Sequence, residues 1–187
     1  MQGRGANWGA EGMAIVEALD EPLLAELYQY WSERRAGRSL PARADIDPVD
    51  IPHLLPHIAL TEIVSPPDGD EPRFRYRLAG TEIEERFGCP LTNRFLDELK
   101  EGDYLTYIQS LYRKLMTGMA PVYAESSFEA GDSNTLIAKR LMLPLSDDQD
   151  TVNMVLSGVV YRDSDPLHRA TVQPVQAQFS ASRSEAE

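Results

Sequence analysis

Two of the chain's three histidines, His53 and His57, lie four residues apart in the sequence IPHLLPHI. On an α-helix this spacing would point both imidazole rings to the same side and supply half of a metal site. Pro56 would stand inside that helix, where its ring clashes with the carbonyl group of Pro52, and residues that precede proline favour extended backbone. The sequence therefore predicts short turns and two histidines with a structural role, and no metal site.

Nucleophilic and phosphate-binding chemistry has little support in the sequence. Cys89 is the only cysteine, and no cysteine–histidine–asparagine set that would lower its pKa can be identified. A small, half-buried thiol is therefore expected. The chain also has no glycine-rich phosphate loop and no GxSxG motif. We therefore expect a protein without catalytic activity.

Arg140 is one of two features that stand above this background. It follows Lys139 within an otherwise apolar run, TLIAKRLMLPL. Because buried arginines are rare, we expect its side chain to point outward, beside Glu125 or Glu129. The alternative is an inward guanidinium that binds an acidic ligand through two hydrogen bonds. The second feature is a set of tyrosines, of which one or two could offer a hydroxyl group to a ligand: Tyr76, Tyr104, Tyr107 and Tyr112.

The composition fits one globular domain with its own core. The chain has 187 residues, 42% of them hydrophobic, and a formal net charge of −12. So acidic a chain is a poor binder of nucleic acid. No run of about 18 apolar residues could span a membrane, and the first residues do not resemble a signal peptide. With a single cysteine, the chain is expected in the reducing cytoplasm.

One basic cluster interrupts this acidic background. Arg34, Arg35, Arg38 and Arg43 lie within ten residues of one another. We interpret the cluster as the solvated end of a helix, where cations favour the negative pole of the helix dipole. The alternative is a docking patch for an acidic partner.

The first expected elements are an amphipathic helix and a connector. The helix should begin at Asp20, as its capping residue, and stop at Gly37, with an apolar stripe at helical spacing. Residues 38–56 contain four prolines and should form a connector of short turns.

A β-hairpin is expected next, from two strands at residues 57–64 and 73–79. Phe74, Tyr76 and Leu78 alternate with arginines in the second strand. Strict alternation places these three side chains on one face.

Two helices are expected after the hairpin, with turns and a short helix around residues 95–99 between them. Thr81 should cap the first, with Glu84 at capping-box spacing, and Gly88 should end it. Asp103 should cap the second and longer helix, which Gly118 should end.

The element order predicts an α+β fold. An amphipathic N-terminal helix precedes a five-stranded antiparallel sheet, and helices are inserted between strands 2 and 3. The last three strands are expected at residues 121–129, 135–145 and 151–161. The expected divisions are a disordered N-terminus at residues 1–12, a single domain at 13–162 and a disordered tail at 163–187.

Three segments resemble the PAS domain family: PARADIDPVDIPHLLPHIAL, RFRYRLAGTEIEERFGCPLTNRFLDEL and RLMLPLSDD. They are similar, more specifically, to a subgroup of stand-alone, largely uncharacterised bacterial PAS domains. The resemblance covers residues 22–162 and is most specific in the first segment, where the prolines align with Arg43, Asp45 and the Leu-Leu-Pro step.

The resemblance implies a single-domain sensor or adaptor that binds a small molecule or a protein partner in signal regulation. The alternatives are an interaction module whose pocket is filled by its own side chains, or a small-molecule enzyme. The ligand pocket is expected between the inner face of the sheet and the helices. Its candidate residues are Leu60, Tyr76, Leu78, Ile83, Phe87, Phe95, Tyr104, Ile108, Arg140, Met142 and Leu156.

The resemblance also implies a homodimer, with output through a signalling partner, because PAS domains often dimerise through the helix before the sheet. Here that helix spans residues 21–36. Its candidate contacts are Leu24, Tyr28, Trp31, Arg34 and Arg35. The alternative is that the apolar stripe packs on the domain's own sheet.

The cofactor is unknown at this point. Flavin photosensors of the superfamily carry a reactive cysteine where this chain has Asn93, which argues against a flavin adduct. Haem-binding members use a histidine on a helix beside the pocket, and no histidine lies between Gly80 and Gly118, which argues against haem. Asn93 also replaces a glycine of the subgroup, and asparagine tolerates the left-handed backbone of such a turn.

Overall fold

The structure is a computed structural model and describes residues 19–66, 71–130 and 134–163. The expected disordered ends lie outside these residues, except that Asp163 belongs to the last strand. In chain order the elements are α2 (Pro22–Arg34), the 3₁₀-helices η1 (Arg43–Asp45), η2 (Pro48–Asp50) and η3 (Pro52–His57), β1 (Ile58–Val64), β2 (Arg73–Ala79), α3 (Thr81–Phe87), α4 (Leu96–Leu99), α5 (Gly102–Gly118), β3 (Val122–Ala130), β4 (Asn134–Leu145) and β5 (Met154–Asp163). Among the described residues, no helix is long and apolar enough to cross a lipid bilayer.

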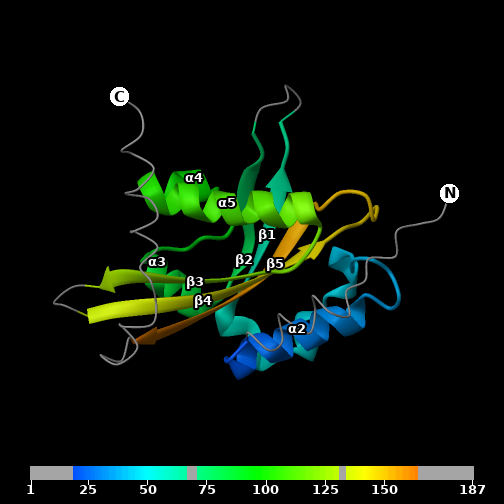
Figure 1. Cartoon of the computed structure of the whole chain (residues 1–187), viewed down its shortest axis with the longest axis horizontal. Helices are drawn as coiled ribbons and strands as arrows, with labels where there is room; N and C mark the ends of the chain where they lie inside the picture. Colours follow the sequence, from blue (N-terminus) through cyan, green and yellow to red (C-terminus); the bar gives the residue numbers. More distant parts are fainter. Residues whose placement is uncertain (1–18, 67–70, 131–133, 164–187) are drawn as a thin grey trace.

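The five strands form one antiparallel sheet in the order β2-β1-β5-β4-β3. Helices α3, α4 and α5 are inserted between β2 and β3, so the predicted α+β class and the predicted insertion are confirmed. In Figure 1, α2 (blue) lies against one face of the sheet and α5 (green) against the other. These two faces are called the α2 face and the α5 face below.

The contact between α2 and the sheet is close because β5 has a glycine beneath the helix. A Cβ atom on Gly158 would lie 2.6 Å from Leu27 Cδ2 and 2.8 Å from Leu24 Cδ2. Trp31 of the same helix is fully buried, and its Nε1 donates a hydrogen bond to the carbonyl of Pro144 at 2.9 Å. Each fully buried side chain of this size contributes about 1.5–3 kcal/mol. The apolar stripe of α2 therefore fixes the helix to its own sheet.

Ion pairs hold the start of α2 to the neighbouring strands. Asp20 does not cap the helix as predicted, because the N-cap residue is Glu21, whose side chain makes no capping bond. Asp20 instead pairs with Lys139 of β4. Glu21 is buried and accepts hydrogen bonds from Arg162 of β5 at 2.6 and 3.0 Å. Both carboxylates thus bind cations of the neighbouring strands instead of capping the helix. Gly37 takes the left-handed conformation expected after a helix, with φ 84°.

One residue in β2 interrupts the expected alternation. Tyr76 pairs with Thr61 and Leu78 with Leu60, so β2 has one residue more than β1 between the two pairs. Residues directly opposite across antiparallel strands share a face. Tyr76 therefore points to the α5 face, as Phe74 does, whereas Leu78 points to the α2 face. The prediction that all three share one face is wrong for Leu78.

Helix α3 begins without the predicted capping box. Its N-cap residue is Gly80, which makes Thr81 the first helical residue. The carboxylate of Glu84 does not fold back on the helix but accepts a hydrogen bond from the backbone N–H of Leu91 at 2.9 Å. Gly88 ends the helix in the left-handed conformation, with φ 75°, as predicted.

Helix α5 is two residues longer at its start than predicted. It begins at Gly102, after the N-cap residue Glu101, so Asp103 lies in the first turn and is not the cap. A carboxylate in the first turn still favours the positive pole of the helix dipole. Gly118 is the last helical residue, and Met119 takes the left-handed position with φ 48°.

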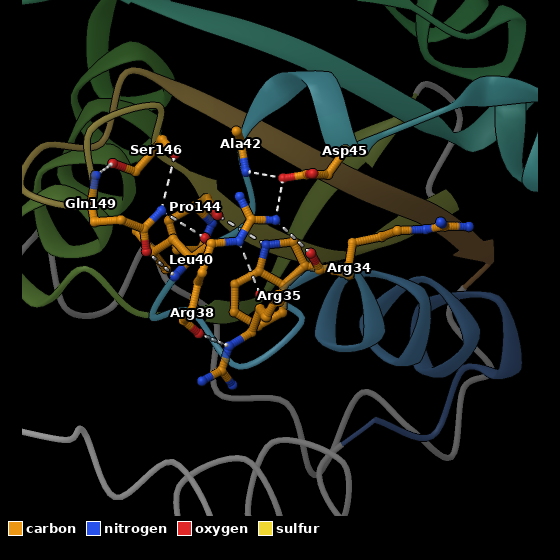
Figure 2. A network of polar contacts seen from close by, with 10 residues as sticks. Arg34, Arg35, Arg38, Leu40, Ala42, Asp45, Pro144, Ser146 and Gln149 are labelled. Carbon is orange, nitrogen blue, oxygen red and sulfur yellow. Dashed lines mark hydrogen bonds and ion pairs between the residues drawn. The ribbon is translucent and has the colours of Figure 1, made fainter.

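The basic cluster is used inside the domain, at the junction between α2 and the connector. Arg38 Nη2 donates to Asp45 Oδ2 at 2.6 Å and to the carbonyl of Arg34 at 3.1 Å (Figure 2). Arg34 in turn donates to Asp50 Oδ2 at 2.7 Å, and Arg43 donates to a carbonyl of its own turn at 2.8 Å. These contacts favour the helix-end interpretation of the cluster over a docking patch.

The connector is also tied to the turn between β4 and β5. The side-chain amide of Gln149 accepts from the N–H of Leu40 at 3.1 Å and donates to its carbonyl at 2.9 Å (Figure 2). The N–H of Ser146 donates to the carbonyl of Pro41 at 2.9 Å. The proline-rich connector is therefore ordered by hydrogen bonds to the sheet, although it contains only short 3₁₀-helices.

The stretch with two histidines forms η3, a 3₁₀-helix with Pro56 inside it. A 3₁₀-helix has 3.0 residues per turn, so residues four apart do not lie on one side. His53 Nε2 lies 2.9 Å from Oε1 of Glu26 on α2, while His57 is at the far end of η3. The two imidazoles therefore point in different directions and do not form a metal-binding pair.

We predict that Gly80 does not tolerate a side chain. A Cβ atom there would lie 2.0 Å from the carbonyl oxygen of Leu55 and 2.3 Å from that of Pro56, both in η3. Gly80→Ala should lower the free energy of unfolding, measured with urea, by about 3 kcal/mol or more. As a control, Gly118→Ala lies in a helix with its nearest contact, Ala120 Cβ, at 3.7 Å, and should be neutral or stabilise by up to about 1 kcal/mol. Equal stability of the two variants would contradict this packing.

Candidate functional site

A cavity lies on the α5 face of the sheet, between the strands and helices α3 and α5. Its walls come from four strands and both helices, so the fold rather than a single loop shapes it. The lining residues are Ala59, Tyr76, Ile83, Phe87, Tyr104, Ile108, Tyr112, Arg140, Met142, Ser157, Val159 and Tyr161.

Most of the residues expected in a pocket are brought together in this cavity. They are Tyr76, Ile83, Phe87, Tyr104, Ile108, Arg140 and Met142. Leu60, Leu78 and Leu156 are not among the lining residues. They are paired with one another across β2, β1 and β5, on the α2 face.

Phe95 also lies away from the cavity. It forms an isolated bridge with Arg75 at the outer edge of β2. The guanidinium carbon of Arg73 lies 3.8 Å from the centre of the Phe95 ring. The ring therefore contributes to a cation–π contact at the edge of the sheet and not to the pocket.

The sequence reasoning missed several lining residues on β1 and β5. Ala59 pairs with Ser157, which places both on the α5 face. Val159 and Tyr161 follow Ser157 at alternate positions and share that face. Only the strand register reveals this set, although a lone serine within the apolar run MVLSGVVY was a usable signal.

Arg140 points into the cavity, contrary to the expected outward orientation. Lys139 lies opposite Glu125 in the β3–β4 pair and faces α2, where it meets Asp20. Since adjacent residues of a strand face opposite sides, Arg140 must face α5. Its side chain is 7% exposed. The lysine therefore lies on the α2 face of β4, and the arginine lies on the α5 face, inside the cavity.

The guanidinium of Arg140 has few polar contacts inside the cavity. Its Nη2 donates a long hydrogen bond, 3.4 Å, to the hydroxyl of Tyr104, and its Nη1 is buried without a partner. No ion pair within the described residues involves Arg140. An unpaired buried charge is costly, because removal from water is not offset by a nearby opposite charge.

The tyrosine hydroxyls around Arg140 do not supply a negative charge. Burial raises the pKa of Tyr112 and that of Tyr161 to about 12, and raises the pKa of Tyr76 well above its ordinary value. These hydroxyls are therefore protonated at neutral pH. Tyr112 donates to Thr61 Oγ1 at 3.0 Å, so part of the set is engaged in the core. Tyr107 lies outside the lining and donates to a carbonyl of β3.

Ser157 adds a second unsatisfied polar group to the same cavity. Its Oγ atom is buried and has no partner at full hydrogen-bond geometry among the described residues, although the Tyr112 hydroxyl is close enough to interact with it. Arg140 and Ser157 both line the cavity, and they lie on the neighbouring strands β4 and β5. The cavity therefore holds a cation and a hydroxyl with free donor capacity, surrounded by aromatic and aliphatic walls.

The residues expected at a partner surface on α2 are mostly covered by the domain itself. Leu24, Tyr28 and Trp31 are buried. Arg34 pairs with Asp50, and Arg35 lies over the Trp31 ring, with its guanidinium carbon 5.7 Å from the ring centre. The alternative interpretation of the stripe, packing on its own sheet, is what the structure shows.

The described residues contain no group of three or more histidine, cysteine, aspartate or glutamate side chains that could hold a metal ion. Cys89 is partly buried, and its Sγ lies 3.4 Å from Nη1 of Arg94. Asn93 adopts the left-handed conformation with φ 66°, as its position in the turn predicts.

Comparison with known proteins identifies the family. A family model described as PAS domain matches residues 19–160. The chain belongs to the PAS domain family. The match covers α2, the connector, the inserted helices and nearly all of the sheet, and it supports a role as a signal-sensing or interaction module. A search of curated proteins found no match. The cavity of this PAS domain lies between its sheet and the inserted helices α3 and α5.

We predict an alkaline transition that reports the neutral tyrosines of the cavity. Because burial raises the pKa values of Tyr112 and Tyr161 to about 12 from an ordinary 10.0, their contribution to stability is complete below pH 10 and is lost as pH rises toward 12. A titration followed by tyrosinate absorbance, with circular dichroism as the folding signal, should show a late group that ionises together with unfolding.

The matched variant for this titration is Tyr161→Phe. It should reduce the late absorbance change, since one of the buried hydroxyls is gone. If all tyrosines ionise near pH 10 while the domain stays folded, the described burial is contradicted.

Proposed function

We propose that this PAS domain is a single-domain sensor or adaptor that regulates signalling by holding a small molecule in the cavity on the α5 face. It is proposed to act through binding and not through catalysis. The observation that carries the proposal is the buried Arg140 guanidinium, whose Nη1 has no partner in the cavity. Leaving a buried donor unsatisfied costs about 1–3 kcal/mol, and more for a charged group. Such a cost is typical of positions retained for binding.

The ligand must be small, or the lining rings must move when it binds. The cavity has a volume of about 20 Å³, which is room for about one water molecule. Phe87 and Tyr104 line it and are only partly buried, so their rings have space to rotate. A rotation of these rings would couple occupancy of the cavity to the surface of α3 and α5.

The small volume also favours a second candidate function. The domain would then be a protein-interaction module whose pocket is filled by its own side chains. Under either function the output passes through protein contacts, either in a homodimer or with a signalling partner. We place this activity in the cytoplasm, in line with one partly buried thiol and no other cysteine.

The test of ligand binding is a thermal-shift screen with small polar and amphipathic molecules, together with native mass spectrometry of the purified protein. A ligand should raise Tm of the unmodified domain, because it binds only the folded state. Ala59→Leu fills the cavity and should abolish the shift. Leu60→Met, at the adjacent residue on the α2 face, should retain it, since the change conserves volume.

If no compound shifts Tm and the native mass shows no bound molecule, the sensor function is contradicted and the interaction module is favoured. A shift that survives Ala59→Leu would place the ligand elsewhere on the domain.

A further inference from the structure

We propose that the ligand is a small organic monocarboxylate, held by its carboxylate at Arg140 and Ser157 with its apolar part against the helices. The inference rests on the proposed function and narrows it to one chemical class. The carboxylate would accept hydrogen bonds from Arg140 Nη1 and Ser157 Oγ, the two lining atoms that are buried without partners. The apolar part would lie against aliphatic residues of α3, α5 and β5.

The charge of Arg140 decides the sign of the ligand. A guanidinium keeps its proton in proteins, so the cavity contains a full positive charge at any pH near neutrality. The nearby tyrosines are neutral, and no described carboxylate pairs with the guanidinium. A neutral ligand would leave this charge uncompensated and would displace any water that solvates it. An anion removes the cost and gains a charge-assisted hydrogen bond.

The number of cations limits the charge of that anion to one. Apart from Arg140, every lining residue is uncharged. A phosphate dianion would enter an apolar cavity with one of its charges unpaired, which is unfavourable. A carboxylate has one charge and a planar pair of oxygens that matches the guanidinium. The donor capacity of one arginine and one serine therefore fits a carboxylate better than a phosphate.

The lining residues of the cavity limit the size and polarity of the rest of the ligand. Ile83, Ile108 and Val159 are buried and aliphatic, and the remaining walls are mainly aromatic rings. With so little free volume, the apolar part must be short, on the order of a few carbon atoms, or a flat ring that takes the place of a rotated side chain. A hydrophilic di- or tricarboxylate has no partners for its further charges.

Two cations beside the lining rings add to the attraction for an anion. Lys100 Nζ lies 4.7 Å from the centre of the Phe87 ring and 6.0 Å from that of Tyr104. The guanidinium carbon of Arg86 lies 5.3 Å from the centre of the Tyr161 ring. On a chain with a net charge of −12, these cations keep the approach to the cavity locally favourable for a small anion.

A purely structural role for Arg140 makes the opposite prediction about stability. If its contact with Tyr104 holds the core together, Arg140→Met should destabilise the ligand-free domain. If Arg140 is kept for a ligand, the substitution removes an unpaired buried charge and should leave Tm unchanged or raise it. This measurement needs no ligand and also shows whether the variant is folded.

The binding experiment uses calorimetric or NMR titration of the full chain with propionate, butyrate and benzoate. The probes for comparison are the matching neutral amides and inorganic phosphate. We expect the carboxylates to bind at least about tenfold more tightly than the amides, because a charge-assisted hydrogen bond is about twice as strong as a neutral one. Arg140→Met should remove this preference, and Ser157→Ala should weaken carboxylate binding by a smaller factor. Leu60→Met, on the other face, should change neither.

Each outcome separates the ligand class from the proposed function. Equal affinity for amides and carboxylates, or tighter binding of phosphate, would overturn the carboxylate class and leave a small-molecule sensor. Carboxylate binding that is unaffected in Arg140→Met would overturn the assigned site. Failure of every probe to bind the unmodified domain, with Arg140→Met less stable than the parent, would overturn both.

Discussion

The alternation of side chains along β4 is the constraint on which the rest of the structure depends. Lys139 faces α2 and meets Asp20, so its neighbour Arg140 faces the cavity. A shift of one residue in the register of β4 would exchange the two cations. It would place the arginine beneath α2 and the lysine in the cavity. The nine residue pairs between β3 and β4, and the ten between β4 and β5, hold this register.

The two faces of the sheet therefore differ in the polarity of their buried side chains. On the α2 face, the contact over Gly158 and the hydrogen bond from Trp31 to a strand carbonyl produce close packing. The α5 face contains buried tyrosines, a serine and an arginine whose donors are only partly used. The α5 face therefore retains groups that a core built only for stability would not keep.

The sequence was sufficient for the order of the elements, because apolar periodicity and glycine positions are local properties. Glycine ends such as Gly88 followed from backbone conformation alone. The helix starts were predicted less well. Asp20 and Glu84 make their bonds to distant partners, and these partners compete with the caps that local spacing suggested.

The candidate site was predicted in part for the same reason. Tyr76, Ile83 and Met142 line one cavity, and the alternation or helical spacing of each within its own element indicated the face on which it lies. Leu78 was misplaced because the extra residue in β2 has no signal in the alternating sequence. The orientation of Arg140 required the pairing of β4 with β3, and burial statistics favoured the wrong side. The residues whose face could not be predicted, Leu78 and Arg140, are those whose orientation depends on the strand register rather than on residue type.

The central claim is that the buried charge of Arg140 exists to hold an anion. The most direct test is a crystal structure of the protein purified and crystallised without added carboxylic acids or other small anions. We expect a compact planar density in the cavity, with an oxygen about 2.7–2.9 Å from Arg140 Nη1. A cavity that contains only protein atoms or water, with the guanidinium paired to a carboxylate of the chain itself, would contradict it.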